Sequence, residues 1–205
     1  LPYNFPSLQK LNTFIVAVYD ITKQKYVFLD SSMAVPALNI LPLDLAVNKA
    51  RILSLKEKED KKWVNVMALS DNKSFMKIDA RIEGNQVKGH RSTVLYGQEA
   101  IEYQTNEKHK QDSLVSNPKN NVSQKEKLTF TNLKVKKQEN DYALIEEEFD
   151  FVLQADRTND HLYINPMLFP QLKNNPFIQT ERVLPIEFPY PYKFTMLSTL
   201  TLPDG

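Results

Sequence analysis

The side chain best placed to do chemistry in this sequence is the carboxylate of Asp30, because it directly follows the apolar, strand-like run 26–29. A carboxylate at a strand end can orient a histidine base in a nucleophilic triad. Ser31 and Ser32 come next, and aspartate followed by serine is also a common turn or cap arrangement. On these grounds we favour a structural role for Asp30.

The sequence offers little else for catalysis or for binding a metal. It has no cysteine, which removes disulfides, thiolate ligands and a cysteine nucleophile from this chain. His90, His109 and His161 fall on three separate expected elements, with no second histidine at ligand spacing, so we expect no metal site. The acidic run 146–148 with Asp150 would send its side chains to opposite faces of a strand, which favours a solvated strand over a calcium site. We therefore predict no cofactor.

Aromatic residues and prolines alternate near the C-terminus and form a candidate binding patch. Phe188, Tyr190 and Tyr192 are separated by Pro189 and Pro191. Exposed aromatic rings would suit a glycan or a peptide. Proline and aromatic side chains also pack against each other at the edge of a sheet, and this is the interpretation that we favour.

The charge balance gives no indication of a polyanionic partner. The chain has 26 Lys and Arg against 25 Asp and Glu, a formal charge of +1, so we expect no nucleic-acid binding. Lys134, Lys136 and Lys137 lie close together, and we expect them to protect an edge strand against sheet-to-sheet aggregation. No apolar run approaches the roughly 20 residues needed to cross a bilayer, so we expect no transmembrane segment here. The first residue is Leu1, without a basic and apolar leader, and we expect a fragment of a longer protein.

The elements that must position these residues are mostly strands. Twelve Pro, 4 Gly and many β-branched and aromatic residues favour strands with proline-bearing connections. The runs 14–19 and 26–29 predict an opening hairpin, and the continuous apolar character of 14–19 predicts a strand covered on both faces. Runs 63–69, 74–82 and 86–96 predict an antiparallel meander with a tight turn at 83–85, and 98–115 predicts the one good helix.

The fold class that we predict is mainly β. We divide the chain into a terminal hairpin with its connection (1–45), a β-meander with one helix (46–120) and an immunoglobulin-like β-sandwich (121–205), because five or six strand runs follow at about 10-residue spacing. Within the expected sandwich, the loop 165–177 is rich in Pro and Asn but carries several apolar side chains. We expect this loop, with Phe177, to pack over one end of the sandwich.

Two sets of short motifs carry a resemblance to a known family. The first set is Leu11-Asn12-Thr13-Phe14-Ile15 and Leu29-Asp30-Ser31-Ser32 in the hairpin. The second set lies in the tail and consists of four motifs in order, at 161–166, 175–177, 182–188 and 202–205. With these motifs the chain resembles the C-terminal portion of bacterial transglutaminase-like proteins, whose core is papain-like and which are exported to the cell envelope. The tail resembles a domain of unknown function that follows such cores.

The resemblance implies a site that has lost its base. The family's histidine position falls on Thr13, while its aspartate position falls on Asp30, and threonine cannot accept a proton near neutral pH. We therefore expect no enzymatic activity from this chain and a non-catalytic accessory or interaction region, periplasmic or surface-exposed, with a protein or glycan partner. Two alternatives stay open: the C-terminal part of an active cysteine peptidase or transglutaminase in which Asp30 orients a histidine from elsewhere, and a glycan- or peptide-binding β-module.

Overall fold

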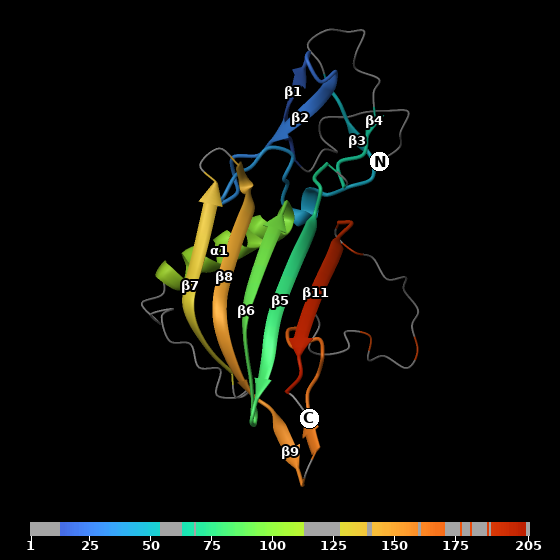
Figure 1. Ribbon diagram of the computed structural model, residues 1–205. Coiled ribbons are helices and arrows are strands. Elements are labelled where there is room, and N and C mark those ends of the chain that lie inside the picture. Colours follow the sequence, from blue (N-terminus) through green and yellow to red (C-terminus); the bar gives the residue numbers. More distant parts are fainter. Residues whose placement is uncertain are drawn as a thin grey trace.

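The structure of this chain is a computed structural model, shown in Figure 1. It describes residues 13–53, 63–67, 69–112, 128–138, 141–159, 161–170, 177, 181, 188 and 190–203. The strands are β1 Val16–Asp20, β2 Lys25–Leu29, β3 Ala50–Arg51, β4 Trp63–Val64, β5 Lys73–Glu83, β6 Gln86–Tyr96, β7 Leu128–Gln138, β8 Asp141–Gln154, β9 Asp156–Thr158, β10 His161–Tyr163 and β11 Lys193–Thr201. The helices are η2 Leu43–Leu45, a 3-10 turn, and α1 Gln98–Asp112.

The largest element is a five-stranded sheet in the order β11-β5-β6-β8-β7. Neighbours β5, β6, β8 and β7 run antiparallel, and β11 runs parallel to β5. The prediction of a mainly β fold is confirmed. Strands from both sides of residue 120 share this sheet, so the segments 46–120 and 121–205 meet in one structural unit. An immunoglobulin-like arrangement of 121–205 is not confirmed, because β7, β8 and β11 join β5 and β6 instead of forming a second packed sheet.

The two faces of the sheet differ in polarity. Along β5, Ser74, Met76, Ile78 and Ala80 are buried, while the side chains between them are exposed. This confirms the predicted alternation, since successive side chains of a strand point to opposite faces. The buried side is called the inner face below and the solvent side the outer face. The core on the inner face centres on Met76, Ile78, Ala80, Val87, Phe149 and Phe151.

The turn between β5 and β6 and the opening hairpin both lie where the sequence predicts them. Gly84 begins the two-residue turn with φ 58°, a left-handed conformation that glycine adopts without strain. Strands β1 and β2 pair antiparallel from Val16↔Leu29 to Asp20↔Lys25.

The expectation that the first hairpin strand is covered on both faces is wrong. The side chains of Val16 and Val18 are 60% and 52% exposed. The two-stranded β1-β2 sheet has no further strand beside β1 in the described residues, which explains why its apolar run remains uncovered.

The part of the chain before β5 has a small core of its own. Phe28, Leu41 and Val66 form its buried centre, so the connection that follows the hairpin packs through Leu41. Strand β4 pairs with β3 and not with β5, which corrects the predicted meander: only its second and third strands are adjacent. Figure 1 shows these short strands beyond one end of the large sheet.

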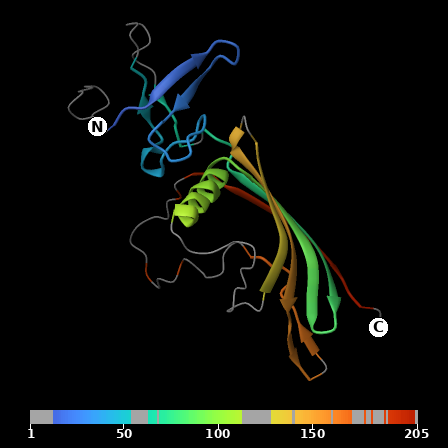
Figure 2. The same cartoon turned by 90° about the vertical axis from the view of Figure 1, so that its left-hand side faces the viewer.

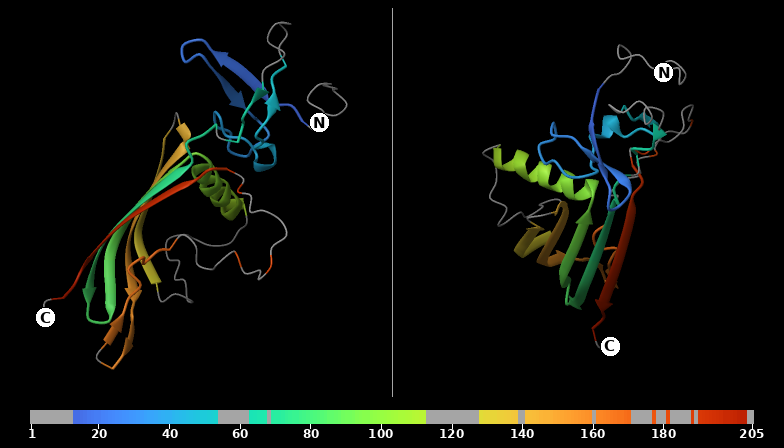
Figure 3. Two further views of the ribbon diagram at one scale, coloured as in Figure 1. Left: turned by 90° about the vertical axis from the view of Figure 1, so that its right-hand side faces the viewer. Right: turned by 90° about the horizontal axis from the view of Figure 1, so that it is seen from above.

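Helix α1 connects this N-terminal part with the large sheet. It lies against one face of the curved sheet near the end that faces the hairpins (Figure 2 and Figure 3). Ile101 packs with Val35 and Ile40, whereas the hydroxyl of Tyr103 reaches β8 on the inner face. The helix begins as predicted at Gln98 and is described to Asp112. In the described part of the chain, no helix is long and apolar enough to span a bilayer.

The segment 161–170 covers part of the inner face. The ring of Phe169 lies 4.9 Å from that of Phe151 and 5.9 Å from that of Phe149, in edge-to-face geometry. Leu168 packs on the same core. The loop thus packs back on the strands at Leu168 and Phe169, but it covers the inner face of the five-stranded sheet and not the end of a sandwich. Residues 171–176 lie outside the described residues. Phe177 is 42% exposed, so the expectation that its ring is buried is wrong.

Candidate functional site

A group of polar side chains interrupts the apolar inner face of the sheet. Arg91 on β6 donates from Nη2 to Oε1 of Glu147 on β8 at 3.3 Å, and from Nε to the hydroxyl of Thr93 at 2.9 Å. Tyr103 on α1 donates to Oε2 of the same glutamate at 2.7 Å. The side chains of Arg91 and Glu147 are only 19% and 14% exposed. They are therefore an ion pair within a mostly apolar environment, where an unpaired charge would be costly.

The guanidinium of Arg91 is also held by aromatic rings. It lies 4.9 Å from the ring centroid of Phe149 and 5.1 Å from that of Phe169. Cations are attracted to aromatic faces at such distances. Burial lowers the pKa of Arg91, and the carboxylate of Glu147 acts in the opposite direction. Arginine stays protonated through this range, so the group is a fixed positive charge and not a base.

This polar group lines a hollow of about 930 Å³ on the inner face, called the concave hollow below. Its lining is partly apolar and partly polar; the apolar lining residues are called the floor below, and the polar lining residues are called the rim. The floor includes Met76, Val87, Leu128, Phe130, Phe149, Leu153, Leu168, Phe169 and Phe194. The rim includes Ser74, Arg91, Thr93, Glu99, Tyr103, Glu147, Asp156 and Tyr192. An apolar concavity of this size with a few placed polar groups is the usual form of a ligand site.

Two of the three aromatic residues singled out in the sequence belong to this region. Tyr192 lines the concave hollow, and its hydroxyl lies 2.5 Å from that of Ser74. The hydroxyl of Tyr190 lies 3.2 Å from Glu99 and 3.0 Å from Glu102, two carboxylates on α1. Both tyrosines thus attach the segment before β11 to the rest of the fold through their hydroxyls. Phe188 is 66% exposed.

Tyr190 and Glu99 both have a raised pKa. Burial raises the pKa of Tyr190, and the neighbouring carboxylates of Glu102 and Glu99 raise it further. Burial likewise raises the pKa of Glu99, which the hydrogen bond from Tyr190 opposes. The negative charge of Glu99 is therefore held in a poorly solvated position.

Asp30 lies directly after β2, in a turn. Its Oδ1 accepts the backbone N–H of Ser32 at 2.8 Å, which is an aspartate turn of the kind expected from the sequence. Asp30 also lines a second hollow of about 850 Å³, between the N-terminal part and the start of α1. Thr13 is exposed and precedes β1. If the β1-β2 register continued, Ile15 and not Thr13 would lie opposite Asp30.

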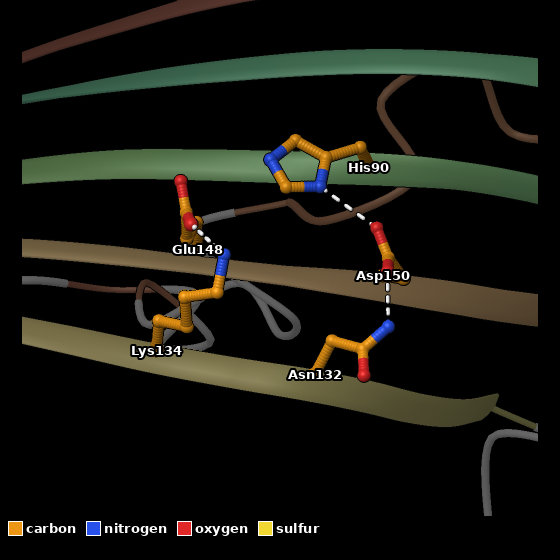
Figure 4. Close-up of polar contacts among 5 residues, drawn as sticks. All are labelled: His90, Asn132, Lys134, Glu148 and Asp150. Carbon is orange, nitrogen blue, oxygen red and sulfur yellow. Dashed lines mark hydrogen bonds and ion pairs between the residues drawn. The ribbon is translucent and has the colours of Figure 1, made fainter.

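The outer face carries a regular set of ion pairs and hydrogen bonds (Figure 4). Asp150 on β8 accepts from Asn132 at 2.7 Å and lies 2.8 Å from Nδ1 of His90, while Lys134 contacts Glu148 at 2.9 Å. The hydrogen bond from Asn132, and then that with His90, lower the pKa of Asp150. These side chains are exposed, so the face is a solvated one and the pairs add little stability.

The alternation predicted for the acidic run places its members on both faces. Glu146, Glu148 and Asp150 point outward to Lys136, Lys134 and His90, while Glu147 points inward to Arg91. Among the residues that the structure describes, no group of three potential ligands is close enough together to hold a metal ion. Strand β7 is an edge of the sheet and carries the lysines that we expected there.

The sequence-based reasoning missed Arg91, Glu147 and Tyr103. A signal for the first two was present, because both occupy inner-face positions: Glu147 lies between Ile145 and Phe149 along β8, and Arg91 pairs with Ile78 and Phe149 on the neighbouring strands. A charged residue at a core position requires a partner, so each predicts the other. Tyr103 gave no such signal, because only the placement of α1 brings it to Glu147.

A comparison with protein families finds one match. Residues 160–205 are similar to a family described as Domain of Unknown Function with solved-structure structure (DUF3858). This confirms the resemblance of the tail to a domain of unknown function, over β10, β11 and the segment between them. No curated protein and no solved structure matches the chain.

Proposed function

We propose that this chain is a non-catalytic interaction region of an exported bacterial transglutaminase-like protein of the cell envelope, and that it binds a peptide segment of a partner in the concave hollow. The observation that carries the binding function is the hollow itself, with its apolar floor and polar rim. Support for the lineage comes from the hairpin and tail motifs; the family match at 160–205 supports only a domain of unknown function in the tail.

The surroundings of Asp30 and Thr13 favour the non-catalytic assignment. Oδ1 of Asp30 is engaged by the backbone of Ser32, and Thr13 supplies no base at the histidine position. Arg91 and Glu147, the strongest polar pair on the inner face, neutralise each other. A pair of this kind can hold a ligand but does not provide a nucleophile.

A peptide fits the hollow better than a glycan does. Glycan sites present flat aromatic faces, whereas the rings of Phe149, Phe151 and Phe169 are packed edge to face against one another. The hydroxyls of Tyr190 and Tyr192 are also engaged with side chains of α1 and β5. Apolar side chains of a peptide would find their counterparts on the floor.

The binding function is tested by selecting displayed random peptides on the purified chain, with counter-selection on the variant Leu153→Trp. The larger ring would occupy the floor of the hollow. We expect enriched peptides that lose binding to Leu153→Trp and keep it with Glu148→Gln, a change on the outer face. If every enriched peptide bound Leu153→Trp as well as the unchanged chain, the hollow would not be the binding site. Turnover of a glutamine-containing peptide by the chain would refute the non-catalytic assignment.

A second candidate function rests on the free oxygen of Asp30. Its Oδ2 has no hydrogen-bond partner among the described residues, and the side chain lines the hollow of about 850 Å³. A histidine from a longer protein could use this oxygen, as a triad requires. In that case Asp30→Asn in the longer protein would abolish peptidase or acyl-transfer activity, whereas an unchanged activity would leave only the turn role.

A further inference from the structure

We infer that the concave hollow selects a peptide segment in which a lysine or arginine follows or precedes a large apolar residue; this rests on the proposed function. The inference comes from the charge on the rim, which the apolar floor alone does not explain. It adds the chemical class of the partner to the proposed binding site.

The positive charge on the rim is already compensated. Arg91 is paired with Glu147, which also accepts the hydroxyl of Tyr103. Because both oxygens of Glu147 are used, this carboxylate offers little to a ligand. The remaining acidic side chains of the rim are Glu99 and Asp156. Asp156 takes part in an interaction of its own, whereas the carboxylate of Glu99 has only the hydroxyl of Tyr190 among the described residues.

The carboxylate of Glu99 is the one that most lacks a cation. Glu99 and its neighbour Glu102 share the hydroxyl of Tyr190, at 3.2 Å and 3.0 Å. A hydroxyl carries one hydrogen and can donate it to only one of the two. In the described part of the chain, neither glutamate pairs with a lysine, arginine or histidine. An incoming ammonium or guanidinium would supply both the missing charge and the missing donors.

The position of Glu99 relative to the floor determines the rest of the ligand. Glu99 and Tyr192 line the same hollow as Met76 and Phe194. A cation bound at Glu99 therefore has an apolar surface beside it. An isolated cation would leave that floor wet, and an isolated apolar group would leave Glu99 uncompensated. A basic residue next to an aromatic or aliphatic residue satisfies both.

The outer face serves as an internal comparison. Its carboxylates also belong to a row of acidic residues, but Glu148 is paired with Lys134 and Glu146 with Lys136. They face water and not an apolar floor, so they have no reason to select a ligand. A change at Glu148 thus removes a carboxylate from the same strand system without touching the hollow.

The experiment uses the full chain and fluorescein-labelled hexapeptides in fluorescence anisotropy. The test peptide alternates phenylalanine and lysine; in one control glutamate replaces lysine, and in the other alanine replaces phenylalanine. We expect saturable binding of the test peptide only, weakened at high salt, as for a partly exposed ion pair. Glu99→Gln combined with Glu102→Gln should weaken binding at least about 10-fold, a loss of one charge-assisted contact, while Glu148→Gln should leave it unchanged.

Several results would overturn the inference. Equal binding of the glutamate peptide, or unchanged binding to the double variant, would show that the rim charge does not select the ligand. Binding of dodecylamine without binding of the peptide would mean that the hollow takes a lipid-like ligand. Self-association of the chain in competition with the peptide would mean that a second copy of the chain occupies the hollow. If the double variant failed to fold by circular dichroism, Glu99→Gln alone would be compared. An acidic or neutral peptide that binds the unchanged chain but not the Leu153→Trp variant would contradict the ligand class and leave the proposed function standing.

Discussion

The side-chain oxygen of Asn72 accepts the backbone N–H of Gln98, the first residue of α1, at 2.9 Å. Asn72 directly precedes β5, so this hydrogen bond fixes the helix start to the beginning of that strand. The same side-chain oxygen accepts the hydroxyl of Ser70 at 2.7 Å, and the carbonyl of Asn72 accepts the N–H of Lys193 at the start of β11. One buried residue thus joins α1, β5 and β11.

We expect Asn72→Ala to lower the free energy of unfolding by about 1–3 kcal/mol, because it leaves a buried helix N–H without its acceptor. Urea unfolding followed by far-UV circular dichroism measures this change. The control is Asn65→Ala, whose side chain accepts the N–H of Met67 at an exposed position. That change should cost less than about 1 kcal/mol. Equal effects of the two substitutions would contradict the role of Asn72.

Gly97 should tolerate a side chain less well than Gly84. Gly97 has φ 67°, and a Cβ there would overlap the side-chain oxygen of Asn72. Gly84 has φ 58° and open space around the position of a Cβ. We expect Gly84→Ala to cost about 1 kcal/mol of backbone strain and Gly97→Ala about 2 kcal/mol or more. Thermal unfolding of both variants gives the comparison, and a smaller loss for Gly97→Ala would be inconsistent with the close contact.

Phe169 should contribute more to stability than Phe177. The ring of Phe169 packs edge to face on Phe149 and Phe151, so Phe169→Ala should lower the free energy of unfolding by about 2–4 kcal/mol. Phe177 is 42% exposed, and Phe177→Ala should cost about 1 kcal/mol or less. Chemical unfolding of the two variants decides between them. A larger loss of unfolding free energy for Phe177→Ala than for Phe169→Ala would mean that Phe177 anchors the loop, as the sequence predicts.

Breaking the pair Arg91 and Glu147 should be worse than removing it. Arg91→Met leaves the carboxylate of Glu147, only 14% exposed, without its cation and should cost about 2–4 kcal/mol. The double variant Arg91→Met with Glu147→Gln should recover part of that loss, since no charge is then left uncompensated. Additive losses in the double variant, measured by urea unfolding, would show that the two side chains do not act as a pair.

The pKa of Asp150 should rise when Asn132 is replaced by alanine. The hydrogen bond from Asn132 is the largest cause that holds this pKa below its usual 3.8. Because the folded pKa lies below the unfolded one, ionised Asp150 stabilises the fold above the unfolded pKa, and this contribution is lost as the pH falls through the folded value. Carboxyl NMR titration of both proteins measures the shift, and Thr131→Ala serves as the neighbouring control. An unchanged titration would remove Asn132 as the cause.

The sequence patterns predicted the elements better than their partners. Alternation along 74–82 gave both faces of β5, and the apolar runs around 20–25 gave the β1-β2 hairpin. The pairing of β11 with β5 could not be predicted in this way, because no local pattern encodes a parallel contact between distant segments. For the same reason the sequence patterns do not show that strands from both sides of residue 120 share one sheet.

The candidate site was only partly accessible to the same reasoning. The sequence marks Tyr190 and Tyr192 as residues of interest, but the hydrogen bonds of their hydroxyls with α1 and β5 depend on how these elements pack. Arg91 and Glu147 could have been predicted as a pair, because both are charged residues at strand positions that face the core. Glu99 carried none, since an acidic residue in the first turn of a helix is ordinary and favourable.

The parallel pairing of β11 with β5 has a consequence for how the chain folds. Lys73 and its partner Lys193 are about 120 residues apart, so this contact raises the contact order of the domain and requires a large loop to close. During synthesis β5 leaves the ribosome long before β11, and its outer edge stays available to other strands in that interval. Strand β11 therefore completes this edge of the sheet late, and chains that stop before it would present an open edge that favours aggregation.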